Sequence, residues 1–170
     1  MTVGVFLGAG VMTREATLPA ERLVEIVGGD VLMVGLGPDP VAGIDPGEVF
    51  LPSITLAESD PSILVIPGGF GCRPLARDAG VVDRIRQIAS SCDGVLSIST
   101  GTLLLAATGL LAGKRAAGHW LTRDELAPFG VDLSDAPIVR HGRLFTTSGS
   151  AAAIEAAPML VDTILYGPVR

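Results

Sequence analysis

The chain has 170 residues, of which 48% are hydrophobic and 18% charged, and its formal net charge is −6. This composition excludes a disordered chain and predicts one globular domain, covering residues 1–170, with a full hydrophobic core. The acidic balance, without a basic stripe, argues against nucleic acid as a partner.

Cysteine usage and the apolar segments favour a soluble, cytoplasmic protein. Cys72 and Cys92 are the two cysteines, too few for a disulfide-stapled secreted domain, and no His/Cys cluster has zinc-site spacing. Residues 1–13 contain no Lys or Arg, unlike the start of a secretory signal. The uncharged segment 95–113 is borderline in length for a membrane span and is interrupted by Ser, Thr and Gly. We therefore expect no membrane, metal or cofactor.

Short apolar runs predict the strands of a parallel sheet. Unbroken apolar runs are typical of parallel strands that are covered on both faces. The main predicted strands are residues 2–7, 30–36, 63–66 and 95–98. Short strands are also expected at 48–51, as a sheet edge, and at 116–120, whereas residues 38–46 are expected to form a loop.

Apolar residues at helical spacing predict helices between these strands. The predicted helices are a first one capped by Thr17 and ending at Gly28, then residues 81–89, 100–111, 122–127 and 150–165. We expect Pro158 to kink or split the last helix. His141 and Gly142 are expected at a hairpin tip. The alternation of strands and helices predicts an α/β fold with a mainly parallel sheet.

The segment from Ser97 to Gly101 joins a predicted buried strand to a predicted buried helix. Sites in such folds lie at the carboxyl ends of the strands. A nucleophile elbow places its residue, here Ser99, on a turn of this kind, where the helix dipole favours a developing negative charge. The usual hydrolase pattern has Gly two residues earlier, where this chain has Ser97. A serine that only caps the helix is the alternative interpretation.

Two neighbouring segments favour a functional interpretation. The turn after residues 63–66 contains Gly69, whose N–H could pair with that of Thr100 as an oxyanion hole, although a tight turn alone also requires glycine. His119, beside Trp120, could move protons near neutral pH, although a half-buried structural histidine is the alternative.

Several segments of the chain resemble the ThiJ/PfpI superfamily. They are residues 65–71, 95–120 and 124–131 and, more loosely, 13–19 and 142–157. The similarity is greatest to the isocyanide hydratase branch and to the sensor domains of AraC-type regulators, in which a Cys-Thr-Gly elbow and a His-Trp pair recur. The resemblance implies a flavodoxin-like three-layer sandwich, whose elbow is shared with class I glutamine amidotransferases.

The same resemblance implies roles for five residues. The nucleophilic cysteine of the family falls on Ser99, its acidic partner on Glu15, and its histidine on His119. The oxyanion donors fall on Gly69 and Thr100. Without the resemblance, Glu15 would be interpreted as an ordinary charge in a loop. The replacement of cysteine matters because the pKa of an alcohol lies several units above the thiol value of about 8.5, so a serine nucleophile needs a strong base.

Three interpretations of Ser99 remain open. It is a serine nucleophile, or a polar contact in a hydratase or lyase whose acid–base group is Glu15. Alternatively, the pocket binds a small molecule without turnover, as a sensor, or the serine is a deliberate replacement of cysteine. A serine hydrolase would need His119 to reach Ser99, with Asp124 or Glu15 behind the ring.

The remaining expectations concern other residues and partners. Cys72 follows the Gly-rich turn and is either a small buried side chain or a thiol that serves the site from an unusual position. Cys92 is expected to be structural and His141 to be solvated. Because AraC-type regulators append a helix-turn-helix domain and this chain ends at Arg170, we expect no such regulator. A homodimer acting on a small molecule is expected, since the superfamily commonly pairs and the mean hydropathy is +0.54.

Overall fold

Seven strands form one sheet at the centre of the computed structural model, which describes residues 1–167. The strand order is β10-β11-β7-β6-β1-β2-β5, and only the pair β10–β11 is antiparallel. The strands are β1 (Thr2–Phe6), β2 (Asp30–Gly35), β5 (Ile54–Thr55), β6 (Ile63–Ile66), β7 (Gly94–Ile98), β10 (Ile138–His141) and β11 (Leu144–Thr147). Two small sheets pair β3 (Val41–Ala42) with β4 (Val49–Phe50), and β8 (Arg115–Ala116) with β9 (Asp132–Leu133).

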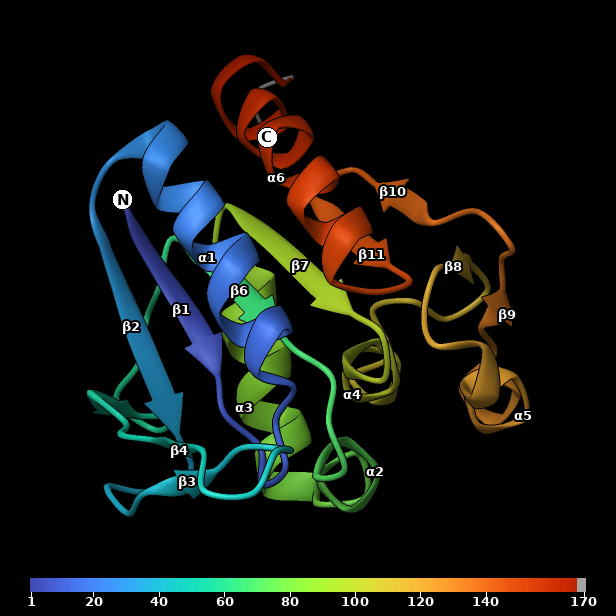
Figure 1. The fold of residues 1–170 in the computed structure, drawn as a ribbon. Coiled ribbons are helices and arrows are strands. Elements are labelled where there is room, and N and C mark those ends of the chain that lie inside the picture. The colour runs from blue at the N-terminus through green and yellow to red at the C-terminus, as the bar shows by residue number, and fades with distance from the viewer. Residues whose placement is uncertain (168–170) are drawn as a thin grey trace.

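Helices cover both faces of the sheet (Figure 1). One face carries α1 (Thr13–Val27) and α6 (Ser150–Tyr166), and the other carries α3 (Ala79–Ser91) and α4 (Gly101–Ala107). The short helices α2 (Cys72–Leu75) and α5 (Arg123–Leu126) lie beyond the sheet, and α5 is flanked by the 3₁₀ turns Trp120–Thr122 and Ala127–Phe129. This three-layer arrangement confirms the predicted α/β fold with a mainly parallel sheet.

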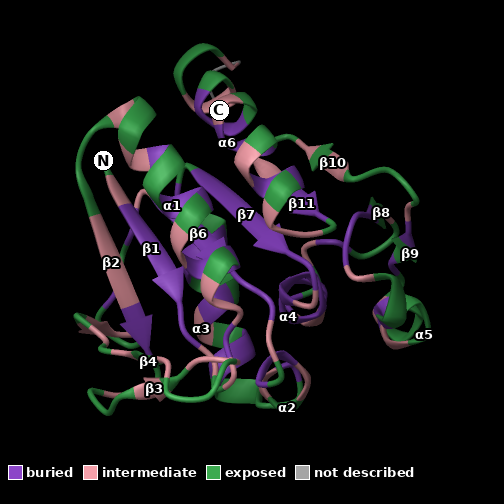
Figure 2. Ribbon diagram, viewed as in Figure 1, coloured by how far each residue is buried: buried purple, intermediate pink, exposed green. Residues whose placement is uncertain are grey.

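Each central strand contributes side chains to two cores. In β6, Ile63 and Val65 join the cluster with α1 and α6, whereas Leu64 and Ile66 join the cluster with α3 and α4. All four residues are fully buried, and β6 and β7 are buried along their length in Figure 2. The unbroken apolar run in the sequence therefore has the predicted cause, which is coverage of the strand on both faces.

The first helix begins earlier than the sequence predicts. It starts at Thr13, because the Met12 carbonyl accepts hydrogen bonds from the N–H groups of Glu15 and Ala16. The Thr17 hydroxyl donates back to the Thr13 carbonyl at 3.0 Å and caps nothing. The prediction of a Thr17 cap was wrong, and Glu15 lies in the first helical turn rather than in a loop.

Pro158 does not split the last helix, which runs unbroken from Ser150 to Tyr166. The proline removes one N–H from the helical ladder, but alanines and a leucine on both sides of it hold the helix against the sheet. These buried residues are Ala152, Ala153, Ala156, Ala157 and Leu160. Tertiary packing outweighs the local cost of about 3 kcal/mol that an interior proline carries.

Other local predictions needed smaller corrections. The helix predicted at 100–111 ends at Ala107, where the Thr108 hydroxyl bonds to the Leu105 carbonyl. Residues 117–120 are not strand, and β8 ends at Ala116. The segment predicted as a loop at 38–46 contains β3, and the strand expected at 48–51 pairs with β3 outside the main sheet. Among the described residues, no helix is long and apolar enough to cross a bilayer.

Gly101 is required where α4 begins beneath the end of β6. A Cβ atom there would lie 2.2 Å from the Ile66 carbonyl oxygen and 2.8 Å from that of Pro67. We expect Gly101→Ala to lower the free energy of unfolding by about 2 kcal/mol or more, because backbone atoms must move. Urea unfolding measures the change. Gly37→Ala is the control, because nothing lies within 4 Å of its Cβ position, and an equal loss in both variants would contradict the prediction.

Candidate active site

Ser99 occupies a strained turn between β7 and α4. Its φ is 56°, and it is the one non-glycine residue among residues 1–167 with positive φ. Such a conformation costs of order 1–3 kcal/mol and is common at functional sites. The Ser99 N–H donates to the Thr147 carbonyl at 2.8 Å, which fixes the turn to the neighbouring strand β11. The predicted elbow geometry is therefore present, with Ser99 at its apex.

Glu15 reaches this turn from the first turn of α1. Its carboxyl group is buried, with 6% of the residue exposed, and it comes close to the Ser99 side chain beside Gly68. The Gly68 N–H donates to Glu15 Oε2 at 2.7 Å. A Cβ atom on Gly68 would lie 2.7 Å from that oxygen and 3.1 Å from Ser99 Cβ, so glycine is needed for the carboxyl group to come this close.

Burial raises the pKa of the Glu15 carboxyl above its ordinary value of 4.5, while the Gly68 N–H and the Ser99 hydroxyl act in the opposite direction. Desolvation penalises the charged form, and here it is the largest effect. Glu15 therefore holds a proton to higher pH than an exposed glutamate does. A carboxyl group of this kind is suited to general acid–base chemistry.

The two predicted oxyanion donors differ in their hydrogen bonding. The Gly69 N–H donates to Thr100 Oγ1 at 2.9 Å, so this amide is already engaged. The Thr100 N–H donates no hydrogen bond within the part of the chain that the structure describes. It lies at the start of α4, where a backbone N–H is available to a ligand.

A pocket of about 270 Å³ opens in front of Ser99. Ser99, Thr100, Gly69 and His119 line it together with Arg73. The remaining wall is apolar and consists of Met12, Ile44, Phe70 and Leu121. Glu15 is not among the lining residues, so its carboxyl group lies behind the Ser99 side chain rather than in the pocket itself.

His119 lines the pocket but does not bond to the elbow. Its Nδ1 accepts a hydrogen bond from the Leu121 N–H at 3.3 Å, and its ring stacks on Trp120 with centroids 5.9 Å apart. No hydrogen bond joins the ring to Ser99 or Glu15 among residues 1–167. The arrangement of a Ser-His-carboxylate triad is therefore not formed here.

The Cys72 thiol lies close to the site but is buried beneath it. It donates to the Pro67 carbonyl at 3.4 Å. Burial raises its pKa to about 11, the Glu15 carboxylate adds to this, and the Thr100 hydroxyl and Arg73 oppose it. At neutral pH the group is a thiol rather than a nucleophilic thiolate.

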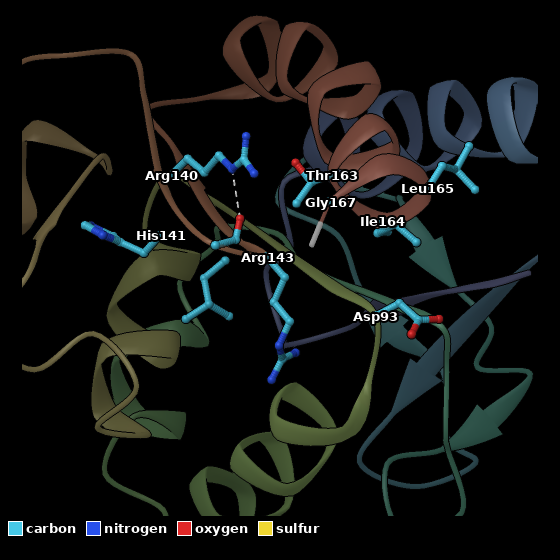
Figure 3. Close-up of a pocket in the computed structure, with 10 residues that line it drawn as sticks. Asp93, Arg140, His141, Arg143, Thr163, Ile164, Leu165 and Gly167 are labelled. Carbon is cyan, nitrogen blue, oxygen red and sulfur yellow. Dashed lines mark hydrogen bonds between the residues drawn. The ribbon is translucent and has the colours of Figure 1, made fainter. Parts of the chain in front are cut away.

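A larger hollow lies elsewhere, beside the hairpin of β10 and β11 (Figure 3). It adjoins Asp93 and Leu144, at the beginnings of β7 and β11, whereas Ser99 follows the carboxyl end of β7. Arg140 and Arg143 point to opposite sides of it. Arg143 donates to the carbonyls of Ser90 and Cys92, so its guanidinium group ties loops together.

His141 departs from the expected solvated tip. It is half-buried, and its Nε2 lies 2.7 Å from the Arg115 carbonyl oxygen. The turn itself forms at the predicted place, with Gly142 at a φ of 59°. The histidine therefore joins the hairpin to β8.

The sequence matches the DJ-1/PfpI family over residues 1–163. The chain belongs to this family. Isonitrile hydratase from Pseudomonas putida is 40% identical over 103 residues, which are 61% of this chain and 45% of that enzyme. The chain therefore matches less than half of the length of the hydratase. The glutathione-independent glyoxalase DJR-1.2 from Caenorhabditis elegans is 29% identical over 162 residues, 89% of this chain and 86% of the glyoxalase.

Solved structures of DJ-1/PfpI proteins share the fold. A ThiJ/PfpI family protein from Pseudomonas syringae has a TM-score of 0.84 at 27% identity, covering 96% of this chain and 68% of that one. Drosophila melanogaster DJ-1beta has a TM-score of 0.81 at 25% identity, covering 98% and 91%. The family membership predicted from the sequence segments is therefore confirmed.

The sequence predicted the residues that meet at the elbow, but not the backbone groups that hydrogen-bond to them. The Gly68 N–H, which holds Glu15, and the Thr147 carbonyl, which holds Ser99, are backbone groups without a side-chain signal. Arg73 was also missed, although it lines the pocket of this DJ-1/PfpI protein. A sequence signal for Gly68 existed in the Pro-Gly-Gly turn, of which only the last glycine was given a role.

The raised pKa of Glu15 predicts a pH-dependent stability. The unfolded chain releases the Glu15 proton near pH 4.5 and the folded chain only at higher pH, so the folded state binds more protons in this window. The stabilisation present below about pH 4.5 is lost as pH rises through the folded pKa. We expect the free energy of unfolding of the wild type, minus that of Glu15→Gln, to fall as pH rises across this window. Urea titrations at several pH values measure this difference. Parallel pH profiles of the wild type and Glu15→Gln would contradict the prediction.

Both native thiols are expected to be unreactive in the folded protein. Cys72 and Cys92 are 5% and 4% exposed, and burial raises the pKa of both. Ellman's reagent at pH 7.5 is expected to label neither thiol within minutes before denaturant is added, and both within seconds afterwards. Rapid labelling of one thiol in the native protein, absent in Cys72→Ala, would give Cys72 a reactive role.

Proposed function

We propose that this chain is a small-molecule enzyme of the DJ-1/PfpI family, of hydratase or lyase type, that adds water to an isocyanide. The observation that carries the proposal is the buried Glu15 carboxyl, which lies close to the Ser99 side chain behind a small pocket. The 40% identity with isonitrile hydratase over 61% of the chain supports the choice of reaction.

Glu15 acts through Ser99 in this proposal, because the carboxyl group does not line the pocket. A hydroxyl can accept one proton while it donates another. The protonated Glu15 carboxyl donates to Ser99 Oγ, and the Ser99 O–H donates its proton to the terminal carbon of the isocyanide, R–N≡C. The carbon then carries a C–H bond and becomes electrophilic, and Glu15 is left as a carboxylate.

Water completes the reaction. Its oxygen bonds to the protonated carbon, and its released proton returns through Ser99 to the Glu15 carboxylate. The nitrogen gains a lone pair, to which the Thr100 N–H donates. The product R–N=CH–OH rearranges to the formamide R–NH–CHO, so one isocyanide and one water are consumed and Glu15 recovers its starting state.

A relaying serine fits this site better than a nucleophilic one. A carboxylate is a weak base toward an alcohol, because their pKa values differ by many units. The His119 ring makes no hydrogen bond to Ser99 within the described residues, so it does not activate the hydroxyl as a general base. Carboxyl-driven hydration avoids this difficulty and does not require the thiol that Ser99 replaces in the family pattern.

A ligand-binding module without turnover is the second candidate. The observation that favours it is the serine at the position of the nucleophilic cysteine. The glyoxalase relative shows that family resemblance by itself does not select one reaction.

The homodimer, the cytoplasmic location and the single-domain organisation over residues 1–170 also remain predictions.

Variants of the relay test the proposed reaction. We expect Glu15→Gln and Ser99→Ala each to lower kcat/KM for benzyl isocyanide by about 10²–10⁴-fold, the range for general acid–base catalysis. Formation of N-benzylformamide, followed by chromatography, measures the rate. The kcat/KM of the wild type is expected to fall as pH rises through the raised pKa of Glu15, because the protonated carboxyl is the active form.

Glu21→Gln is the matched control, since Glu21 is an exposed carboxyl on the same helix. It is expected to leave kcat/KM within twofold of the wild type. Full activity of Glu15→Gln would remove Glu15 from the mechanism. Binding of N-benzylformamide by a wild type that hydrates no isocyanide would favour the ligand-binding module.

A further inference from the structure

Apolar side chains form the outer wall of the pocket in front of Ser99. Phe70, Leu121 and Ile44 line it, and Phe70 and Leu121 are 69% and 55% exposed. Single exposed apolar residues are ordinary, but several around one concave site are typical of ligand contact. They come from the turn before α2, the 3₁₀ turn after His119 and the connection between β3 and β4, so three separate segments converge.

The one cation that lines this pocket among the described residues is already neutralised. Arg73 Nε donates to both carboxylate oxygens of Glu125, at 3.1 and 2.8 Å, and Nη2 donates to Oε1 at 2.8 Å. This ion pair joins α2 to α5. An anionic ligand that approached Arg73 would have to displace Glu125 or be repelled by it.

The size of the pocket limits its ligand. Sites for drug-sized molecules hold about 300–1,000 Å³, and this pocket holds about 270 Å³. The pocket is therefore large enough for a small reacting group that carries one ring or one branched alkyl group.

We propose that the pocket selects an uncharged substrate with an apolar ring or branched substituent, which Phe70 and Leu121 contact, while Glu125 neutralises Arg73 and so excludes anionic substrates. The identity of the substrate's reacting group rests on the proposed function. The inferred substituent and charge of the substrate rest on the residues that line the pocket. In this proposal Glu125 does not touch the substrate. It acts through Arg73, whose charge it neutralises.

Trp120 allows binding to be measured without turnover. It is the single tryptophan of the chain, it stacks on His119, and both of its sequence neighbours line the pocket. Its fluorescence is titrated with three stable probes, namely N-benzylformamide, N-methylformamide and the anion phenylacetate. The wild type is expected to bind N-benzylformamide at least tenfold more tightly than the other two.

Substitutions in the wall test the apolar subsite. Phe70→Ser and Leu121→Ser are expected to raise the Kd of N-benzylformamide about tenfold and that of N-methylformamide less than twofold, because only the larger substituent reaches the wall. Leu51→Ser is the control, since Leu51 is 70% exposed and lies outside the pocket. Equal weakening of both formamides, or no weakening of either, would overturn the assignment.

Substitutions in the ion pair test the exclusion of anions. Glu125→Gln is expected to lower the Kd of phenylacetate at least tenfold, and Arg73→Gln in the same chain is expected to cancel this gain. Circular dichroism verifies that each variant is folded, and Arg73→Gln alone provides a second folded reference. Phenylacetate binding that is unchanged in Glu125→Gln, or equal to that of N-benzylformamide in the wild type, would overturn the proposal.

The binding and turnover results separate the two proposals. If the probes bind in the expected order but no isocyanide is hydrated, the proposed reaction fails and the ligand class stands. If benzyl isocyanide is hydrated but the wall and ion-pair variants bind all probes like the wild type, the ligand class fails and the reaction stands.

Discussion

The contact between a buried carboxyl group and a strained serine organises this site. Glu15 enters from α1, accepts a hydrogen bond from the Gly68 N–H at 2.7 Å, and comes close to the Ser99 side chain. The contact requires the absence of a side chain at Gly68, and Ser99 takes part in it from a turn with a φ of 56°. Because each partner comes from a different element, the geometry depends on α1 and β7 being packed into the same sheet assembly. The pocket opens in front of Ser99, on the side away from Glu15.

The chemistry proposed for the chain follows from where the proton is held. Burial raises the pKa of Glu15, so a carboxylic acid persists to higher pH behind a hydroxyl that can pass the proton on. The Cys72 thiol, with a pKa raised to about 11, contributes no thiolate from below. In front of Ser99 the wall is apolar and its one lining cation is paired within the described residues, so the pocket favours neutral ligands. Burial thus sets the pKa of Glu15, and the pairing of Arg73 sets the charge of the ligand that the pocket favours.

Sequence reasoning identified the central strands because their apolar runs have one cause, burial on two faces. It was less accurate wherever a local signal competed with packing. Thr17 looks like a helix cap, yet α1 begins at Thr13, and Pro158 looks like a break, yet α6 continues through it. In these helices the free energy gained by packing against the sheet exceeds the local propensity that the sequence reveals.

The sequence by itself determined the alternation of strands and helices, the turn at Ser99 and, through resemblance, the family, and it predicted Glu15 as the acidic partner. Only the tertiary structure decided that the Glu15 carboxyl lies behind the serine, that His119 does not bond to Ser99, and that Arg73 is paired with Glu125. The physical reason is that periodicity and turn chemistry act between near neighbours in the chain. Hydrogen bonds, desolvation and charge pairing act between groups that only the packing of distant elements brings together.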